Sequence, residues 1–280
     1  MVRLSFKTKP QETSWRAMEE TWEAAEGLEV LETGWLFDHF VPIHTEDIDA
    51  PCFEGWTALA YLAGRTQRLR LGLMVSSVTY RHPAVLANMV ATLDVASGGR
   101  LDLGLGAGWF EQEHRAYGLD FPSTVERLRR LDDACAVIDA LLTQSVANHA
   151  GPFYTLTDAR CEPKPVQRPR PPLVVGGNGE RYTLRTVARW ADEWNYPGRD
   201  PDELRHKREV LRRHCDDLGR DPGAIATSVH LFPDQDRAAM AAEARALVAA
   251  GADHLILYLA PGYPAEGLGT LTEEVADAVC

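Results

Sequence analysis

An adjacent aspartate and histidine, Asp38-His39, stand at the end of the largely apolar stretch GWLFD and could carry out proton transfer. An imidazole gains and loses a proton near neutral pH, and a neighbouring carboxylate can tune its protonation. These two residues alone are equally compatible with a structural cap at a strand end. The pair therefore marks His39 as a candidate acid/base and leaves the reaction open.

The stretch LDLGLGAGWFEQEH at 101–114 places glycines at alternate positions, 104, 106 and 108, before an aromatic pair. It does not match the dinucleotide fingerprint G-x-G-x-x-G, because Trp109 stands five residues after Gly104. No Gly-Lys-Ser/Thr follows, so a Walker phosphate loop is also excluded. Backbone without Cβ atoms allows the close approach of a planar ring or a phosphate. The alternative is that these glycines serve only packing.

A second glycine-rich stretch, VVGGNGERY, contains Gly176, Gly177, Asn178 and Gly179 between an apolar strand and a helix that we expect to begin near Glu180. Backbone N–H groups at the start of a helix, reinforced by its dipole, bind anions. We expect a phosphate group to bind here, with simple turn formation as the alternative.

Strand-like and helix-like segments alternate along the whole chain. Strands are predicted at 4–8, 34–38, 69–76, 100–106, 172–177, 193–197, 227–232 and 254–260. Amphipathic helices are predicted at 14–27, 54–66, 83–97, 123–144, 180–192, 201–219, 237–251 and 270–279. About eight strand–helix units predict an α/β fold, a (β/α)8 TIM barrel forming a single domain over residues 1–280. A doubly wound open sheet is the alternative. In such a barrel the functional residues gather at the carboxyl ends of the strands.

One long proline-rich segment, about 145–171, interrupts this alternation between the fourth helix and the fifth strand. Long loops inside compact domains are commonly functional, so we expect a lid or a pocket wall. A disordered surface excursion is the alternative.

Composition narrows the function classes. The chain has 280 residues, 45% of them hydrophobic, and a formal net charge of −12. The chain lacks the basic stripe that is typical of nucleic-acid-binding proteins. Its most basic run, at 204–215, has the spacing of a solvated helix face. No apolar run approaches the roughly 18 to 20 residues of a membrane span. The five cysteines are scattered, which predicts no metal site and reduced thiols in a cytoplasmic protein.

Taken together, these motifs resemble the luciferase-like family of flavin and deazaflavin oxidoreductases. The resemblance covers nearly the whole chain and is most specific through 71–123, beside the segments LFDHF and PPLVVGGNGERYTLRTVARWADEWN. The sequences of these segments are most similar to the branch that uses the deazaflavin coenzyme F420. It implies a luciferase-like TIM barrel with an insertion beside the site and a coenzyme ring lying across the strand ends.

The resemblance also implies roles for particular residues. A non-prolyl cis peptide is implied at or near Met74-Val75, with Ser77 close to the coenzyme ring. The coenzyme-binding residues that it implies are Asp38, His39, Met74, Val75, Ser77, Gly106, Ala107, Gly108, Gly176, Gly177, Asn178 and Gly179. Trp109 stands where the sugar-phosphate dehydrogenase branch has an acidic proton donor, which predicts a more apolar pocket. His39 and Trp109 are therefore the candidate catalytic-site residues.

The expected function is hydride transfer between C5 of coenzyme F420 and a small organic substrate. Alternatives are an FMN-dependent monooxygenase of the same fold and a non-catalytic flavin- or deazaflavin-binding protein. Pocket candidates are Glu54, Trp56, Tyr196 and Tyr258, each with an alternative role as a helix cap or core aromatic. The family resemblance predicts a homodimer packed through the early helices, and no nucleic-acid or membrane partner is expected.

Overall fold

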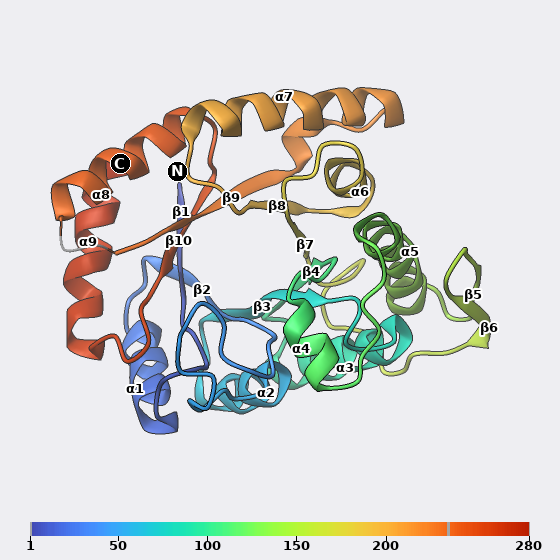
Figure 1. Cartoon of the computed structure of the whole chain (residues 1–280), viewed down its shortest axis with the longest axis horizontal. Helices are drawn as coiled ribbons and strands as arrows, with labels where there is room; N and C mark the ends of the chain where they lie inside the picture. Colours follow the sequence, from blue (N-terminus) through green and yellow to red (C-terminus); the bar gives the residue numbers. More distant parts are fainter. Residues whose placement is uncertain (1, 234–235, 280) are drawn as a thin grey trace.

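Eight parallel strands close into a barrel in the computed structural model, which describes residues 2–233 and 236–279 (Figure 1). In order around the barrel they are β1 (Arg3–Lys7), β10 (His254–Tyr258), β9 (Ala226–Leu231), β8 (Glu193–Tyr196), β7 (Leu173–Gly176), β4 (Leu101–Gly106), β3 (Arg70–Ser77) and β2 (Leu31–Leu36). Each begins and ends within three residues of its predicted stretch. The (β/α)8 prediction is confirmed.

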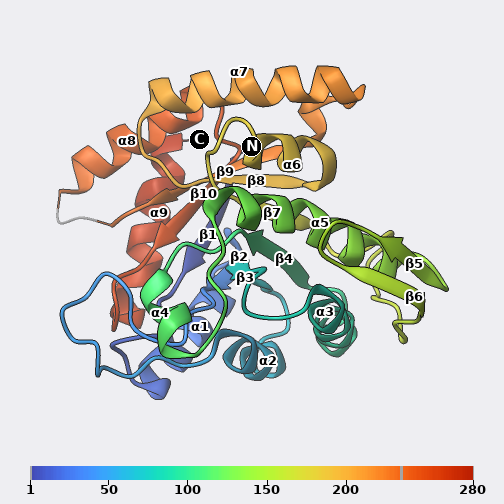
Figure 2. The same ribbon diagram turned by 45° about the vertical axis from the view of Figure 1, so that its right-hand side comes forward.

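Helices connect successive strands and surround the barrel (Figures 1 and 2). They are α1 (Trp15–Glu26), α2 (Gly55–Arg65), α3 (Pro83–Ser97), α5 (Thr124–Thr143), α6 (Thr183–Trp190), α7 (Pro201–Leu218), α8 (Arg237–Ala249) and α9 (Leu268–Val279). Side chains at their N-termini explain several boundaries, since Ser14, Ser123 and Asp200 each accept a hydrogen bond from a first-turn N–H. A short helix, α4 (Glu111–Ala116), follows β4 and was not predicted.

Most residues of the barrel strands are buried, because both faces of the sheet are covered. Their outward side chains pack with the helices in one large core cluster. Their inward side chains include a small separate cluster of Trp35, Met74, Val174 and Ile256 inside the barrel. Because every neighbouring pair of barrel strands is parallel, the loops that follow the strands all meet at one rim. The motifs after β2, β4 and β7 are thereby brought together.

The insertion contains a hairpin, β5 (Ala147–Ala150) and β6 (Thr155–Ala159), which lies outside the barrel beside α5 (Figure 2). Asp133 of α5 holds it, accepting hydrogen bonds from the backbone N–H groups of Phe153 and Tyr154. Residues 145–171 line neither of the two cavities at the strand ends, so the expected lid or pocket wall is not seen there. The tip of the hairpin nevertheless reaches the start of α3, where Tyr154 packs edge-on against His82, and Pro152 lines a separate cavity beside α5.

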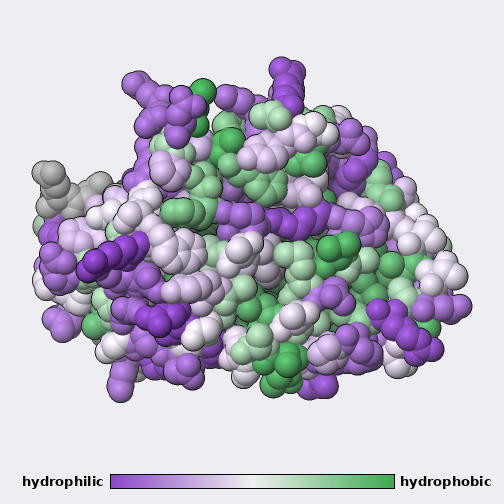
Figure 3. Space-filling model, turned by 90° about the horizontal axis from the view of Figure 1, so that it is seen from below, coloured by the Kyte–Doolittle hydropathy of each residue, from purple (hydrophilic) through white to green (hydrophobic). Residues whose placement is uncertain are grey.

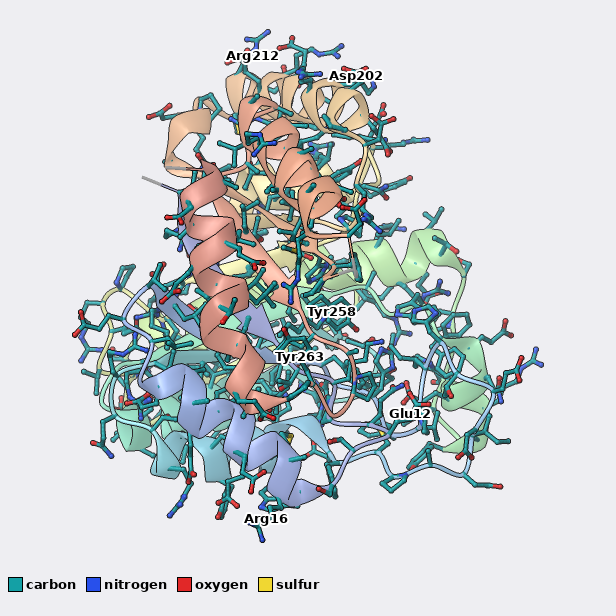
Figure 4. The ribbon with its side chains drawn as sticks, turned by 90° about the vertical axis from the view of Figure 1, so that its left-hand side faces the viewer. Glu12, Arg16, Asp202, Arg212, Tyr258 and Tyr263 are labelled. Atoms are coloured by element: carbon teal, nitrogen blue, oxygen red, sulfur yellow. The ribbon has the colours of Figure 1, made fainter. Side chains whose placement is uncertain are left out.

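The surface is mixed in polarity. Figure 3 shows polar and apolar residues interspersed over the face that is lowest in Figure 1. The basic run on α7 is a solvated helix face as predicted: Arg212 pairs with Glu209 and Asp216 of the same helix, and Figure 4 shows it pointing away from the barrel with Asp202. In the described part of the chain, no helix is both long and apolar enough to cross a membrane.

Candidate coenzyme and active site

Two neighbouring cavities open at the carboxyl ends of the strands. The glycine-lined cavity, of about 440 Å³, is bounded by the residues after β4 and β7, including 106–109 and 176–179. The histidine cavity, of about 250 Å³, is bounded by residues after β1, β2, β3 and β10, including His39 and Tyr258. The two share five wall residues, namely Met74, Val75, Gly108, Trp109 and Pro197. They are therefore adjacent across the barrel mouth, and the two cavities together are called the groove below.

Val75 forms a bulge in the wall between the two cavities. The Met74–Val75 peptide bond is cis, at the position that the resemblance implied, and the β3–β4 register shifts beside it. A Cβ on Gly106 would lie 2.6 Å from Val75 Cγ2, and one on Gly176 would lie 3.1 Å from Val75 Cγ1. At Gly104 a Cβ would lie 2.0 Å from the carbonyl oxygen of Leu73.

These distances show that the missing side chains make room for Leu73 at Gly104 and for Val75 at Gly106 and Gly176, the packing role given above as the alternative. Gly106 and Gly176 also line the glycine-lined cavity together with Val75, so their contact with a coenzyme ring stays a prediction. The distinction matters because a side chain at Gly106 or Gly176 would displace Val75 and reshape both cavities.

The loop after β7 has the features of an anion site. Gly177 has a φ of +124°, a conformation that favours glycine, and Gly177, Asn178 and Gly179 all line the glycine-lined cavity. The loop leads into α6, whose N-cap residue Tyr182 provides no side-chain hydrogen bond. The helix begins at Thr183, three residues after the expected start, and the N–H groups of Gly177 and Leu184 already donate to Asn195 and Gly179. The N–H groups of Asn178 and Gly179, which have no partner among the described residues, and the helix dipole favour a phosphate at this end of the groove.

His39 is held by Glu113, a carboxylate from α4 that sequence reasoning missed. Nδ1 of His39 lies 2.9 Å from Oε2 of Glu113, whose side chain is fully buried. Tyr80 donates its hydroxyl proton to the same oxygen, and the N–H groups of Phe40 and Val41 donate to the other.

The protonation states of Glu113, Tyr80 and His39 follow from the contacts between them. Burial raises the pKa of Glu113, but the hydrogen bonds from His39 and Tyr80 outweigh it and hold the pKa below its ordinary value. Burial and the bond to Glu113 raise the pKa of the Tyr80 hydroxyl, so it remains a donor. An ionised carboxylate only accepts, so Nδ1 of His39 carries a proton. In the neutral imidazole Nε2 is then the basic atom, and it has no hydrogen-bond partner among the described residues.

Asp38 does not pair with its neighbour His39, contrary to the reading of these residues as one unit. Its buried carboxylate receives two hydrogen bonds from Arg81, which also pairs with Glu54. Burial raises the pKa of Asp38, and the contacts with Arg81 oppose that rise. Glu54 caps α2 by accepting from the N–H groups of Trp56 and Thr57. Asp38 still lines the histidine cavity, while Glu54 lines neither cavity.

Trp109 forms part of both cavity walls and is half-exposed. Its ring stacks on His44 with centroids 5.2 Å apart, and it meets His39 edge-on with centroids 5.7 Å apart. The aromatic side of the groove is therefore continuous from Trp109 to His39.

Ser77 also lines the histidine cavity, as expected. Its hydroxyl hydrogen-bonds the hydroxyl of Thr79, which in turn hydrogen-bonds Nε2 of the buried His114 at 2.6 Å.

The remaining predicted residues separate into two groups. Ala107 and Tyr258 each line one of the two cavities, as predicted. Trp56 is buried and donates its indole N–H to Ser76, and the buried Tyr196 donates its hydroxyl to Glu203 of α7. Among the described residues these two bound neither cavity, so their alternative role as core aromatics is the one observed.

Comparisons with known proteins agree with this architecture. The family model described as luciferase-like monooxygenase matches residues 3–276. An F420-dependent glucose-6-phosphate dehydrogenase of Amycolatopsis mediterranei is 33% identical over 63% of this chain and 52% of its own. A phthiodiolone/phenolphthiodiolone dimycocerosates ketoreductase of a Mycobacterium species is 35% identical over 64% of this chain and 47% of its own. The chain thus spans about half the length of these curated relatives.

Among solved structures, an F420-dependent secondary alcohol dehydrogenase in complex with an F420-acetone adduct superposes over 100% of this chain and 99% of its own. The TM-score is 0.86 at 18% sequence identity, a likeness of fold.

Proposed function

This chain belongs to the luciferase-like monooxygenase family, and on that premise we propose that it is a coenzyme F420-dependent oxidoreductase. The reaction that we propose is hydride transfer to or from a carbon–oxygen group of a small organic substrate, with His39 as the acid/base. The observation that carries the proposal is the groove that joins an anion-binding loop to a histidine held by a buried carboxylate. The name of the first curated relative, an F420-dependent dehydrogenase, supports the F420 assignment. Both names, a dehydrogenase and a ketoreductase, support a carbon–oxygen group on the substrate.

The groove fits a long, flat coenzyme with a phosphate in its tail. The loop at Gly177–Gly179 would hold the phosphate in the glycine-lined cavity, and Val75 and Gly108 would border the ring. Coenzyme F420, when bound, supplies a carbon atom, C5, that exchanges a hydride with the substrate. The histidine cavity leaves space beside this position for a small molecule.

The chain itself supplies orientation and a proton-carrying group. Glu113 keeps the proton of the neutral imidazole on Nδ1, so Nε2 can accept a proton from a substrate hydroxyl. In the opposite direction the protonated imidazole returns that proton to the carbonyl oxygen, and Glu113 stabilises its positive charge. Trp109 and His44, whose rings stack on each other, form the aromatic part of the wall beside this position.

A titration with oxidised F420 and, separately, with FMN tests the coenzyme assignment. We expect saturable binding of F420 at micromolar concentration and weaker binding of FMN, followed by turnover in a screen of alcohols and ketones. Preferential micromolar binding of FMN would instead support the monooxygenase alternative. Tight coenzyme binding without turnover of any electron acceptor would support the non-catalytic alternative.

A pair of glycine variants connects this binding to the proposed phosphate loop. Gly177→Ala places a side chain at a φ of +124° in the groove, and it should weaken F420 binding. Gly219→Ala is the matched control, because it has a φ of +65° at the end of α7, away from both cavities. Equal F420 affinity in the two variants would argue against a phosphate at this loop.

A homodimer packed through the early helices is part of the same proposal. Val85 and Val95 of α3 are 57% and 41% exposed and would be covered in such a pair. Light scattering on the purified chain measures its mass directly, and replacing both valines by serine should release monomers if α3 is at the interface.

A further inference from the structure

Lys7, at the end of β1, is a buried cation that the mechanism above does not use. Its side chain lines the histidine cavity, and the residue is only 5% exposed. Within residues 2–233 and 236–279 its ammonium group has no ion pair and no hydrogen bond to protein. An ammonium group carries three N–H donors, and a buried donor without an acceptor is strongly unfavourable.

The surroundings of Lys7 are aromatic or cationic. Its Nζ lies 4.4 Å from the ring centroid of Tyr258, and Nζ of Lys9 lies 5.2 Å from the same centroid. Figure 4 shows Tyr258 near the centre of the molecule, while Arg16 on α1 points outward. A cation–π contact attracts the ammonium group but accepts no conventional hydrogen bond.

Two further polar atoms, one on β2 and one on β9, are also without hydrogen-bond partners among the described residues. Trp35 stands opposite Lys7 in the β1–β2 register, and its indole Nε1 is buried with no hydrogen bond to a described residue. The same holds for Nε2 of His230 on β9, whose ring packs on Tyr258 with centroids 5.1 Å apart. Three unsatisfied polar groups therefore lie close together in the barrel, around Lys7 and Tyr258.

The acidic residues of the groove cannot compensate Lys7, because they are already engaged. Asp38 pairs with Arg81, and Glu113 is bound by His39 and its neighbours. Burial, with repulsion from Lys9, lowers the pKa of Lys7 to about 7. An anion beside Lys7 would supply acceptors for its N–H groups and favour the charged form.

We propose that Lys7 is a substrate-binding residue that holds a carboxylate, so that the substrate is a small organic acid with its reacting carbon–oxygen group toward His39. This inference rests on the proposed function for the identity of the reacting group, while the anion subsite itself rests on Lys7 and its surroundings. It predicts that a negatively charged substrate is preferred over a neutral one of the same shape.

Calorimetric titrations with two acids and their neutral amides test the subsite: acetate against acetamide, and benzoate against benzamide. We expect at least one acid to bind the wild-type chain more tightly than its amide. Lys7→Met should weaken binding of that acid on the order of 10- to 100-fold, as expected for loss of a charged hydrogen bond. Lys7→Arg should retain most of the preference, and Lys9→Met, the matched control, should change it by less than about threefold.

The outcomes separate this inference from the proposed function. An acid preference that disappears in Lys7→Met and persists in Lys9→Met supports the subsite. The absence of any acid preference in the wild-type chain overturns it without reference to a variant, as does unchanged acid binding in a folded Lys7→Met. Titration of the same preparations with F420 is a separate readout, because failure to bind F420 would reject the coenzyme proposal while leaving the acid–amide comparison valid.

Discussion

Replacing Glu113 by glutamine tests whether this carboxylate orients His39. The carboxylate accepts hydrogen bonds from His39, from the Tyr80 hydroxyl and from the N–H groups of Phe40 and Val41. Glutamine keeps the volume but loses the charge, and only one of its two terminal atoms accepts. A hydrogen bond to a charged group contributes about 1.5–3 kcal/mol, which corresponds to roughly 10- to 100-fold in an equilibrium constant.

We therefore expect Glu113→Gln to lower kcat about 10- to 100-fold, because the imidazole loses its orientation and the stabilisation of its charged form. KM and the dissociation constant of F420 should change by less than about threefold, since the cavity walls remain. His39→Ala removes the proton-carrying atom itself and should lower kcat by roughly 10²- to 10⁴-fold.

The assay combines steady-state turnover of F420, with a substrate found in the screen, and long-range ¹H–¹⁵N spectra of the histidine-labelled chain. The spectra should show the wild-type His39 proton on Nδ1 in alkaline buffer and a mixture of tautomers in Glu113→Gln. Glu111→Gln is the matched control on the same helix, because Glu111 is half-exposed and pairs with Arg115. Wild-type kcat in a folded Glu113→Gln, or a wild-type imidazole protonated on Nε2, would refute the reasoning.

Three further predictions concern stability. Gly106→Ala places a Cβ 2.6 Å from Val75 Cγ2 and should destabilise the chain by about 1–3 kcal/mol in chemical denaturation, an effect that Val75→Ala in the same chain should partly relieve. Arg81→Met leaves the buried Asp38 without its partner and should cost about 3–5 kcal/mol, whereas a loss below about 1 kcal/mol would show that the pair is not structural. Burial raises the pKa of Glu193, but its contacts with the buried His254 and with Arg3 outweigh this and lower the pKa to about 2. The resulting stability is present above the ordinary glutamate pKa and is lost as the pH falls toward 2, so melting curves of Glu193→Gln should depend less on pH in this range than those of wild type.

The architecture could be predicted from the sequence because strand and helix periods alternate along the chain. Apolar runs such as 69–76 indicate strands buried on both faces, and capping residues such as Ser14 and Ser123 mark where helices begin. The place of 145–171 could not be predicted, because proline content does not show where a long insertion packs. The hairpin lies along α5 and reaches His82 at the start of α3, but it lines neither strand-end cavity.

The loops that form the candidate site could be predicted from the sequence, but the side-chain contacts between them could not. The residues after β2, β4 and β7 were expected at one rim because parallel strands place them there. Glu113 was missed because α4 is only six residues long and leaves no periodic signal. The sequence offers Glu111 and Glu113 as equal candidates after β4, and only packing shows which of them is buried beside His39. The one sequence signal that could have marked Glu111 or Glu113 as a site residue is its position in the segment that follows β4.

The role of Val75 shows a different limit of sequence reasoning. Spacing identified the glycines of β4 and β7, but it could not distinguish room for a ligand from room for a neighbouring side chain. The Cβ positions of Gly106 and Gly176 are taken up by contact with Val75, which then borders the groove itself.

A crystal structure of the chain with F420 tests the central claim most directly, namely that one coenzyme lies along the groove formed by both cavities. We predict that its phosphate accepts hydrogen bonds from the backbone N–H groups of Asn178 and Gly179 and that its ring lies against Val75, with C5 accessible from the histidine cavity. A phosphate bound elsewhere, or a ring outside the groove, would contradict the account.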